Sequence, residues 1–191
     1  MASDPPVLGF ETQPAWEEWL AAQPAASPGV WLKIAKKGSG FASLDYPAAL
    51  ESALCYGWID GQKRPLDAQF WLQKFTPRRP GSSWSRVNCE KAQALIAAGR
   101  MQPAGLRQVE LAQADGRWDS AYDSQSKIAV PPDLQRELDQ NAAARQFFDL
   151  LDSANRYAIL YRLQTAKKPE TRLARLRKFV EMLANGQKIH P

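Results

Sequence analysis

Histidine and cysteine are scarce in this chain of 191 residues. The one histidine, His190, stands next to the C-terminal residue, and the two cysteines, Cys55 and Cys89, show no CxxC spacing. A Cys/His metal site is therefore not expected, and the sequence indicates no cofactor. A Ser-His-Asp or Cys-His catalytic arrangement would have to use a histidine at a chain end, where fraying is common. The sequence thus favours a binding protein over an enzyme and assigns no catalytic residue.

Long apolar runs are also missing. No stretch approaches the roughly 20 apolar residues that span a bilayer, and residues 1–16 lack the basic and apolar regions of a signal peptide. Two cysteines without a pairing pattern fit reduced thiols, so we expect a cytoplasmic protein. The composition, with 45% hydrophobic and 24% charged residues, is that of an ordinary globular chain. Its length suits one good core or two small subdomains that share an interface.

Acidic residues are few after residue 155, and the net charge of +5 is unevenly placed. From Arg156 onward nine basic residues stand against two acidic ones, which gives +7 there and leaves −2 for residues 1–155. The candidate basic surface consists of Lys167, Lys168, Arg172, Arg175 and Lys178. A second basic cluster consists of Lys63, Arg64, Lys74, Arg78, Arg79 and Arg86. Such clusters attract phosphate, nucleic acid or anionic lipid, but they also occur as solvated helix faces.

The first half of the chain mixes strands and helices. Residues 30–36 alternate, with Val30, Leu32 and Ile34 on one face and Trp31 and Lys33 on a wetter one, as in a half-buried strand. Further strands are predicted at 7–10, from residue 58 and, as its antiparallel partner, at 70–75. A helix begins near residue 14.

Residues 46–56 show the signals of a complete helix. Asp45 suits the N-cap, Pro47 suits the first turn, and Gly57 suits the position after the helix, where a positive φ is favoured. The next segment, CYGWIDG, raises the question of what Asp60 does. Asp-Gly is a preferred hairpin turn, but the next strand-like run begins only near residue 70. The alternative is that Asp60 ends a strand and pairs with a basic residue, Arg78 first of all.

After residue 82 the pattern is helical. Helices are predicted from just after Trp84 or Ser85 to 98, at 103–114, from 131, after an Asn141 cap, from a Ser153 cap to about 166, and from Pro169 to a stop at residues 185–186. The last helix places Leu173, Leu176, Val180 and Leu183 on its apolar stripe. The fold class is therefore α+β: a small, mostly antiparallel sheet with helices, followed by an all-helical C-terminal half. We expect subdomains at 1–90 and 91–191, packed together as one compact unit.

Two loops are candidates for ligand contact. The stretch KKGSG at 36–40 fails the phosphate-loop pattern, in which the lysine follows the glycines, so a strand end with a flexible turn is the simpler interpretation. The proline-braced loop FTPRRPGSSWS at 75–85 holds its side chains at fixed angles, and an arginine there can grip a carboxylate or phosphate. It can equally be structural, with its serines capping the following helix. The candidate ligand-binding residues are Lys36, Trp58, Asp60, Arg78, Trp84 and Asn88.

Several stretches resemble one bacterial family over nearly the whole chain after about residue 10. They include VWLKIAKKGSG, ALCYGWIDGQKRPLD, FTPRRPGSSWSRVN, AGRMQPAG and NRYAILYRLQTAKKPETRLARLRKFV. The chain is similar to the YdeI/OmpD-associated, or bacteriocin-protection, proteins. That resemblance implies a link to tolerance of bacteriocins and cationic antimicrobial peptides, and it implies no catalytic residue. Tyr56 stands where the family pattern is expected to have phenylalanine, and its hydroxyl matters only if it lines a pocket.

Three functions remain open from the sequence. The first is a cytoplasmic binding or interaction protein that acts in envelope stress and binds a small anionic molecule or a protein partner. The second is a small enzyme with an anion-binding pocket around Asp60 and Arg78. The third, not favoured, is nucleic-acid binding through the basic C-terminal helices, where no helix-turn-helix or RNA-binding motif is recognisable.

Overall fold

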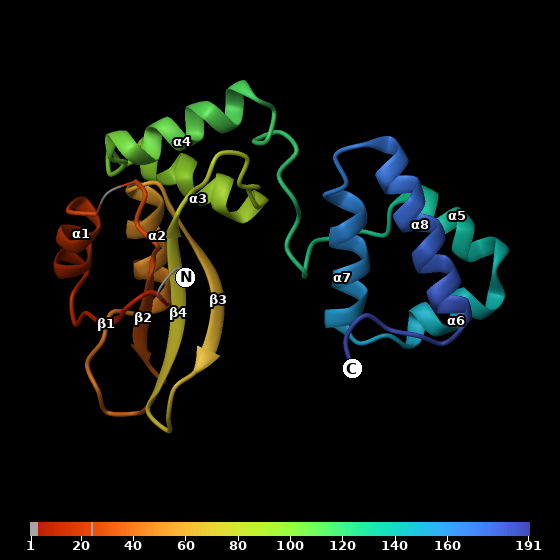
Figure 1. Ribbon diagram of the computed structural model, residues 1–191, viewed down its shortest axis with the longest axis horizontal. Helices are drawn as coiled ribbons and strands as arrows, with labels where there is room; N and C mark the ends of the chain where they lie inside the picture. The colour runs from red at the N-terminus through yellow and green to blue at the C-terminus, as the bar shows by residue number, and fades with distance from the viewer. Residues whose placement is uncertain (1–3, 24) are drawn as a thin grey trace. The chain divides into compact units, whose positions relative to one another are not determined.

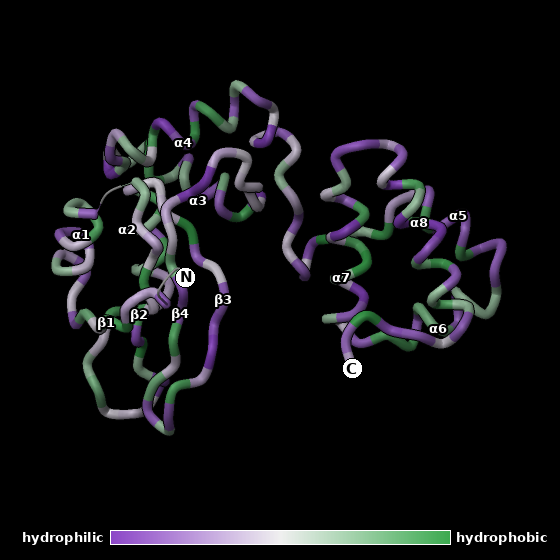
Figure 2. The backbone as a smooth tube through the Cα atoms, in the orientation of Figure 1, coloured by the Kyte–Doolittle hydropathy of each residue, from purple (hydrophilic) through white to green (hydrophobic). Residues whose placement is uncertain are grey.

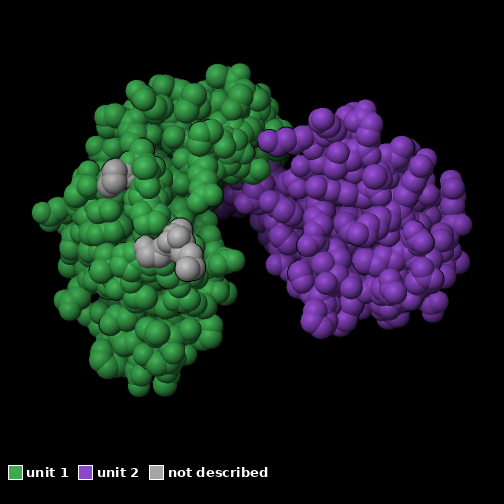
Figure 3. Space-filling model, viewed as in Figure 1, with its two compact units in different colours: residues 1–84, 88–121 green, residues 85–87, 122–191 purple. Residues whose placement is uncertain are grey.

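The chain forms two compact units in a computed structural model that describes residues 4–23 and 25–191. Unit 1 comprises residues 1–84 and 88–121, and unit 2 comprises residues 85–87 and 122–191 (Figure 3). The expected division after residue 90 falls inside a helix instead. Residues 88–121 belong to unit 1 because Ala92, Leu95, Val109 and Ala112 all pack in its core. That the two parts form one compact body stays a prediction.

Unit 1 is built on a four-stranded sheet (Figure 1). Its strands are β1 (Val7–Gly9), β2 (Val30–Ala35), β3 (Trp58–Pro65) and β4 (Phe70–Pro77), in the order β1-β2-β4-β3. The β2–β4 and β3–β4 pairs are antiparallel, whereas β1 runs parallel to β2. The α+β prediction is confirmed, with a mixed sheet in which the β1–β2 pair is the departure from the antiparallel pattern.

The described residues of this part of the chain form four helices. They are α1 (Gln13–Ala21), α2 (Tyr46–Cys55), α3 (Arg86–Ala97, in unit 1 from residue 88 on) and α4 (Pro103–Ala114). The predicted caps of α2 are confirmed: the Asp45 carboxylate accepts a hydrogen bond from the Ala48 N–H at 2.8 Å, and Gly57 has a φ of 77°. One sheet face and these helices share a core that includes Trp16, Leu32 and Phe75, each with no exposed surface.

The other face of the sheet is not the wetter face that the alternation in β2 predicts. Trp31 is only 4% exposed, because the guanidinium of Arg64 lies 4.1 Å and the ammonium of Lys74 5.5 Å from its ring centroid. Leu72 is buried on the same face. Long cationic side chains from two neighbouring strands thus cover this tryptophan with their stems.

Asp60 and Gly61 form neither a hairpin turn nor a strand end. Both lie inside β3, where the register with β4 shifts between Asp60 and Lys63, which is a β-bulge. The bulge lets β3 continue to Pro65, so the connection to β4 is only four residues long. The sequence contains no strong apolar pattern for the second half of β3, which is hydrophilic (purple) in Figure 2. Backbone pairing with β4 holds this second half of β3 in the strand conformation.

Unit 2 is helical, as predicted. Its helices are α5 (Pro132–Gln140), α6 (Ala142–Leu150), α7 (Ser153–Gln164) and α8 (Pro169–Ala184). Asn141 caps α6 as expected, but Asp152, not Ser153, caps α7 by accepting from the Asn155 N–H at 2.7 Å. In α8 the predicted stripe is shifted: Leu173 is 48% exposed, and Phe179 is buried with Leu176 and Leu183. Among the described residues, no helix is long and apolar enough to cross a membrane.

Candidate functional site

The structure divides the six predicted ligand-binding residues among different places in unit 1. Trp58 and Arg78 line one cavity, and Trp84 lies directly against the Arg78 guanidinium. Asn88 is buried in the first turns of α3 and is not among the lining residues. Asp60 and Lys36 also lie outside this lining, Asp60 in β3 and Lys36 just after β2. The cavity is therefore the place where the predicted residues come together best.

The cavity has a volume of about 360 Å³ and lies where the ends of five elements meet. Its wall consists of Leu20, Ala21, Gln23, Ala25, Tyr56, Gly57, Trp58, Pro77, Arg78, Gln102, Pro103, Ala104 and Gln108. These residues come from the end of α1, the α2–β3 junction, the end of β4 and the start of α4. Among the described residues of this wall, Arg78 carries the one full charge, so the wall favours an anion.

Arg78 is fixed in place despite its charge. The residue is only 6% exposed, and the guanidinium carbon lies 3.5 Å from the centroid of the Trp84 ring. Its NH1 donates to the Ser83 carbonyl at 3.2 Å, and its backbone N–H donates to the Gly57 carbonyl at 2.9 Å. Trp84, itself 2% exposed, packs on Trp118 with ring centroids 4.9 Å apart. A stacked, buried guanidinium of this kind is preorganised to grip a carboxylate or phosphate.

The first turn of α4 supplies the second feature of the cavity. Gln102 is the N-cap, yet its side chain makes no capping hydrogen bond, and Pro103 follows it. Gln102, Pro103 and Ala104 all line the cavity. The N-terminus of a helix carries partial positive charge and unsatisfied N–H groups, so it adds to the attraction that Arg78 exerts on an anion.

Close backbone contact holds α4 in this position. Gly105 is buried, and a methyl group built on it would overlap the carbonyl oxygens of Cys55 and Leu54. The Gln102 N–H donates to the Cys55 carbonyl at 3.1 Å. Sequence reasoning missed these residues, although the small-residue stretch PAG at 103–105 is a signal of close helix approach.

Tyr56 is one of the residues that line the cavity, which is the condition under which its hydroxyl is relevant to ligand binding. Burial raises the pKa of this phenol, and the nearby Glu17 and Cys55 raise it further. The group is therefore a neutral hydrogen-bond donor at ordinary pH. Burial likewise raises the pKa of the Cys55 thiol, an effect that Arg100 opposes, so Cys55 is a thiol rather than a nucleophilic thiolate.

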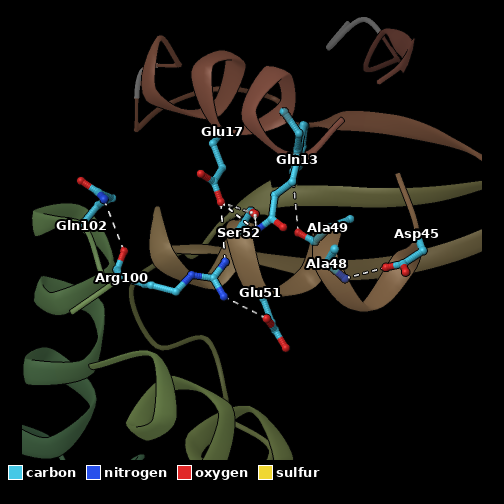
Figure 4. A network of polar contacts seen from close by, with 10 residues as sticks. Gln13, Glu17, Asp45, Ala48, Ala49, Glu51, Ser52, Arg100 and Gln102 are labelled. Atoms are coloured by element: carbon cyan, nitrogen blue, oxygen red, sulfur yellow. Dashed lines mark hydrogen bonds and ion pairs between the residues drawn. The ribbon is translucent and has the colours of Figure 1, made fainter. Parts of the chain in front are cut away.

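A polar network lies beside the cavity and joins α1, α2 and the segment before α4 (Figure 4). Ser52 donates to the Glu17 carboxylate at 2.7 Å, and Gln13 donates to both Ser52 and Glu17 at 3.0 Å. Arg100 pairs with Glu51 at 3.2 Å and with Glu17 at 3.7 Å. Because each group has its partner within the network, we interpret it as the support that holds these three segments together.

Lys36 and Asp60 have separate surroundings. Lys36 donates to the Asp67 carbonyl at 2.7 Å and borders a hollow of about 430 Å³ with Lys63, Arg64, Pro65 and Trp71. The Asp60 carboxylate accepts a hydrogen bond from the Tyr46 hydroxyl at 2.8 Å. In the strand register Asp60 lies opposite Phe75, three positions before Arg78. An ion pair between Asp60 and Arg78 stays a prediction, and the cavity around Arg78 is formed without Asp60.

The predicted basic surface of unit 2 is partly committed to holding its helices together. Arg172 makes a two-pronged contact with Asp133, at 2.8 Å from both Nε and NH2, and its NH1 donates to the Leu163 carbonyl at 2.6 Å. Arg175 donates to the Arg162 carbonyl at 2.6 Å. Both arginines thus cap the C-terminal end of α7. The remaining three residues, Lys167, Lys168 and Lys178, are exposed.

The pairing of Asp133 predicts a dependence of unit 2 stability on pH. The Arg172 hydrogen bonds hold the pKa of Asp133 below its ordinary value, against the opposing effect of burial. A lowered folded-state pKa stabilises the fold above the unfolded-state value, and that contribution is lost as pH falls through the folded-state pKa. We therefore expect urea unfolding of the chain to show stability falling between about pH 5 and pH 2. Asp133→Asn should flatten this fall, and an unchanged profile in the variant would contradict the assignment.

Comparison with known families follows the division into two units. Residues 8–108, from β1 into α4, match the model of a domain of unknown function (DUF8412). Residues 127–186, which include α5 to α8, match the model of the bacteriocin-protection, YdeI or OmpD-associated family. No curated protein and no solved structure gives a match. The cavity residues from Leu20 to Gln108 thus lie in the part that has no assigned function.

The fold and the cavity define a two-part α+β protein whose first unit has an arginine-lined cavity and whose second unit is a four-helix assembly. The chain belongs to the family of the domain of unknown function DUF8412, whose model matches residues 8–108, and its second unit is similar to the bacteriocin-protection, YdeI or OmpD-associated family over residues 127–186.

Proposed function

We propose that the protein binds a small anionic molecule in the unit 1 cavity and acts as a binding protein rather than as an enzyme. The observation that carries the proposal is the buried Arg78 guanidinium, stacked on Trp84 at 3.5 Å, on the wall of a cavity of about 360 Å³. A cavity of this size lies at the lower end of the usual range for small-molecule sites.

The wall also limits the chemistry of the ligand. Arg78 provides a fork that matches one carboxylate or phosphate group, and the start of α4 attracts the same charge. Tyr56, Gln102 and Gln108 offer uncharged hydrogen-bonding groups, and Trp58 offers an apolar surface. A ligand with one anionic group and a small partly apolar body fits this set. The described wall residues offer hydrogen-bonding groups, one cation and apolar surface, which is the set that binding of such a ligand needs.

The proposal extends to a biological role, for which the family description names bacteriocin protection. We propose that ligand binding in the cytoplasm contributes to tolerance of bacteriocins or cationic antimicrobial peptides. The support is the match of residues 127–186 to the bacteriocin-protection family. Cells without the gene should survive a challenge with a cationic peptide less well than cells with it, and equal survival would contradict this part.

Binding is tested by thermal shift, because a ligand that prefers the folded state raises its apparent stability by mass action. The probes are inorganic phosphate, pyrophosphate, acetate and citrate at fixed ionic strength. We expect at least one to raise the unfolding temperature of the protein. Arg78→Lys keeps the charge but loses the two-pronged geometry. This variant should need about tenfold or more ligand to reach the same rise in unfolding temperature.

A second variant separates binding from folding. Ala21→Phe changes an exposed wall residue at the end of α1 and should fill the mouth of the cavity without disturbing the core. It should abolish the shift while the unliganded unfolding temperature stays near that of the wild type. As a matched control, Ala114→Phe at the end of α4 is outside the wall and should leave the shift intact. If Ala21→Phe and Ala114→Phe both show the same ligand-induced shift as the wild type, the cavity is not the binding site.

A further inference from the structure

The sheet face of unit 1 that lies opposite the helices combines cationic and aromatic side chains. Side chains alternate along a strand, so the register of the sheet defines which residues share the face opposite the helices. The residues at these positions are Val7, Gly9, Trp31, Lys33, Ala35, Ile59, Arg64, Phe70, Leu72, Lys74 and Thr76. We call this set the outer face. It has three cations and two aromatic residues, and none of its positions holds a carboxylate.

The three cations surround Leu72 at the centre of the outer face. Lys33 and Arg64 are the register partners of Leu72 in β2 and β3, and Lys74 follows two positions along β4. With strands about 4.8 Å apart and alternate residues about 6.6 Å apart, their Cα atoms stand roughly 8–10 Å from one another. None of the three forms a salt bridge with a described residue. Three like charges at this spacing repel one another unless an anion lies between them.

The charges are also held in place rather than left to move in solvent. Arg64 and Lys74 lie over the ring of Trp31, and the Lys33 ammonium lies 4.6 Å from the centroid of the Phe70 ring. Such contacts restrain long side chains and keep their charged ends on the face. The indole N–H of Trp31 is buried there and donates to no described group. A buried donor without an acceptor is costly, so the cover that Arg64 and Lys74 form over Trp31 leaves this group unsatisfied.

An aromatic pair continues the row of cations. Phe41, 56% exposed, packs on Phe70 with ring centroids 5.1 Å apart, beside Lys33. Regularly placed cations beside an exposed ring suit a strand of alternating phosphates and bases, since phosphates meet the charges and a base stacks on the ring. A lone phosphate would need only one or two of these groups.

We propose that the outer face binds single-stranded nucleic acid, with phosphates at Lys33, Arg64 and Lys74 and a base stacked on Phe41. This activity is separate from the unit 1 cavity and does not depend on it. It also differs from binding through the helices of unit 2, where Arg172 and Arg175 are engaged with α7 and Asp133.

The experiment is fluorescence anisotropy of the full chain with a labelled oligothymidylate and a labelled oligoadenylate RNA over a range of salt. We expect binding at low salt that weakens as salt rises. The variant K33Q/R64Q/K74Q should lose affinity by about tenfold or more. The slope of its log affinity against log salt concentration should become shallower by about 2, since each lost phosphate contact removes roughly 0.7. The matched control K167Q/K168Q/K178Q removes the same charge from exposed lysines of unit 2 and should bind like the wild type.

Two further arms cover other outcomes. Phe41→Ala, at an exposed ring outside the core, should weaken binding severalfold without changing the salt slope. This variant and Lys33→Gln decide the question if the triple variant fails to fold by circular dichroism. Absence of wild-type binding at low salt overturns the proposal, as does equal loss in the unit 2 control. Binding to phosphatidylglycerol vesicles but to neither oligonucleotide would also overturn it, in favour of an anionic membrane surface.

Discussion

Replacing Gly105 by alanine is expected to destabilise unit 1 by about 2–3 kcal/mol, although the change adds only one methyl group. Helix propensity alone predicts the opposite sign, since alanine is better than glycine inside a helix by about 1 kcal/mol. The physical reason is the space around Gly105: the new methyl group would overlap the Cys55 carbonyl oxygen and lie 2.7 Å from that of Leu54. Both are backbone atoms of α2, so α4 must move as a whole.

The same movement should reach the cavity. Gln102, Pro103 and Ala104, directly before Gly105, form part of its wall. We therefore expect Gly105→Ala to weaken anion binding as well as stability, even though Gly105 is not itself a wall residue. A variant that is destabilised but binds with wild-type affinity would show that the start of α4 does not contribute to the site.

Tryptophan fluorescence gives a direct measurement of this effect. All seven tryptophans lie at residues 16–118, within unit 1, so their emission follows the unfolding of that unit. Gly61→Ala is the matched control, because its new methyl group would meet only ordinary contacts, 3.8 Å from the Lys74 carbonyl oxygen. We expect the control to unfold within about 0.5 kcal/mol of the wild type. Equal urea midpoints for the two variants would contradict the close approach of α4 to α2.

Local chemistry explains which features could be predicted from the sequence. The caps at Asp45 and Asn141 and the glycine at 57 depend on residues within four positions, so their signals survive in any fold that keeps the helix. The choice of Ser153 as a cap was wrong by one residue, since Asp152 stands beside it and accepts the hydrogen bond instead. Helix ends differ by a residue or two for this reason, because neighbouring polar residues compete for the capping position.

Features that depend on partners far along the chain could not be predicted in the same way. The burial of Trp31 comes from Arg64 and Lys74, which reach it from other strands. The bulge at Asp60 depends on the register with β4, which no local pattern shows. In α8 both Leu173 and Phe179 have helical spacing to Leu176 and Leu183, and packing within unit 2 decides that Phe179 is the buried one.

The candidate cavity shows the same limit. Arg78, Trp58 and Trp84 could be found because an arginine between prolines and nearby tryptophans is unusual in sequence. Gln102 and Gln108 carry no such signal, and they reach the cavity only because Gly105 lets α4 approach α2. Residue type therefore identified the charged part of the wall, and tertiary packing supplied the uncharged part.

Replacing Arg172 by glutamine is expected to destabilise unit 2 by about 2 kcal/mol. Arg172 joins three helices: it lies in α8, holds the Asp133 carboxylate at the start of α5 with two contacts of 2.8 Å, and donates to the Leu163 carbonyl near the end of α7. Glutamine can replace at most part of this set and removes the charge. The cost is moderate rather than extreme because both side chains of the pair keep nearly 30% of their surface exposed.

The measurement uses two signals from one urea titration. Far-ultraviolet circular dichroism follows the helices of both units, whereas tryptophan emission follows unit 1, so the difference between the curves reports unit 2. Arg177→Gln is the matched control, since Arg177 is exposed on the same helix, and it should change stability by less than about 0.5 kcal/mol. Arg172→Lys should recover about half of the loss, because an ammonium keeps the charge without the two-pronged geometry. If the glutamine variants at 172 and 177 behave alike, then Arg172 is a surface charge, and it becomes available again as a phosphate contact on the basic helices of unit 2.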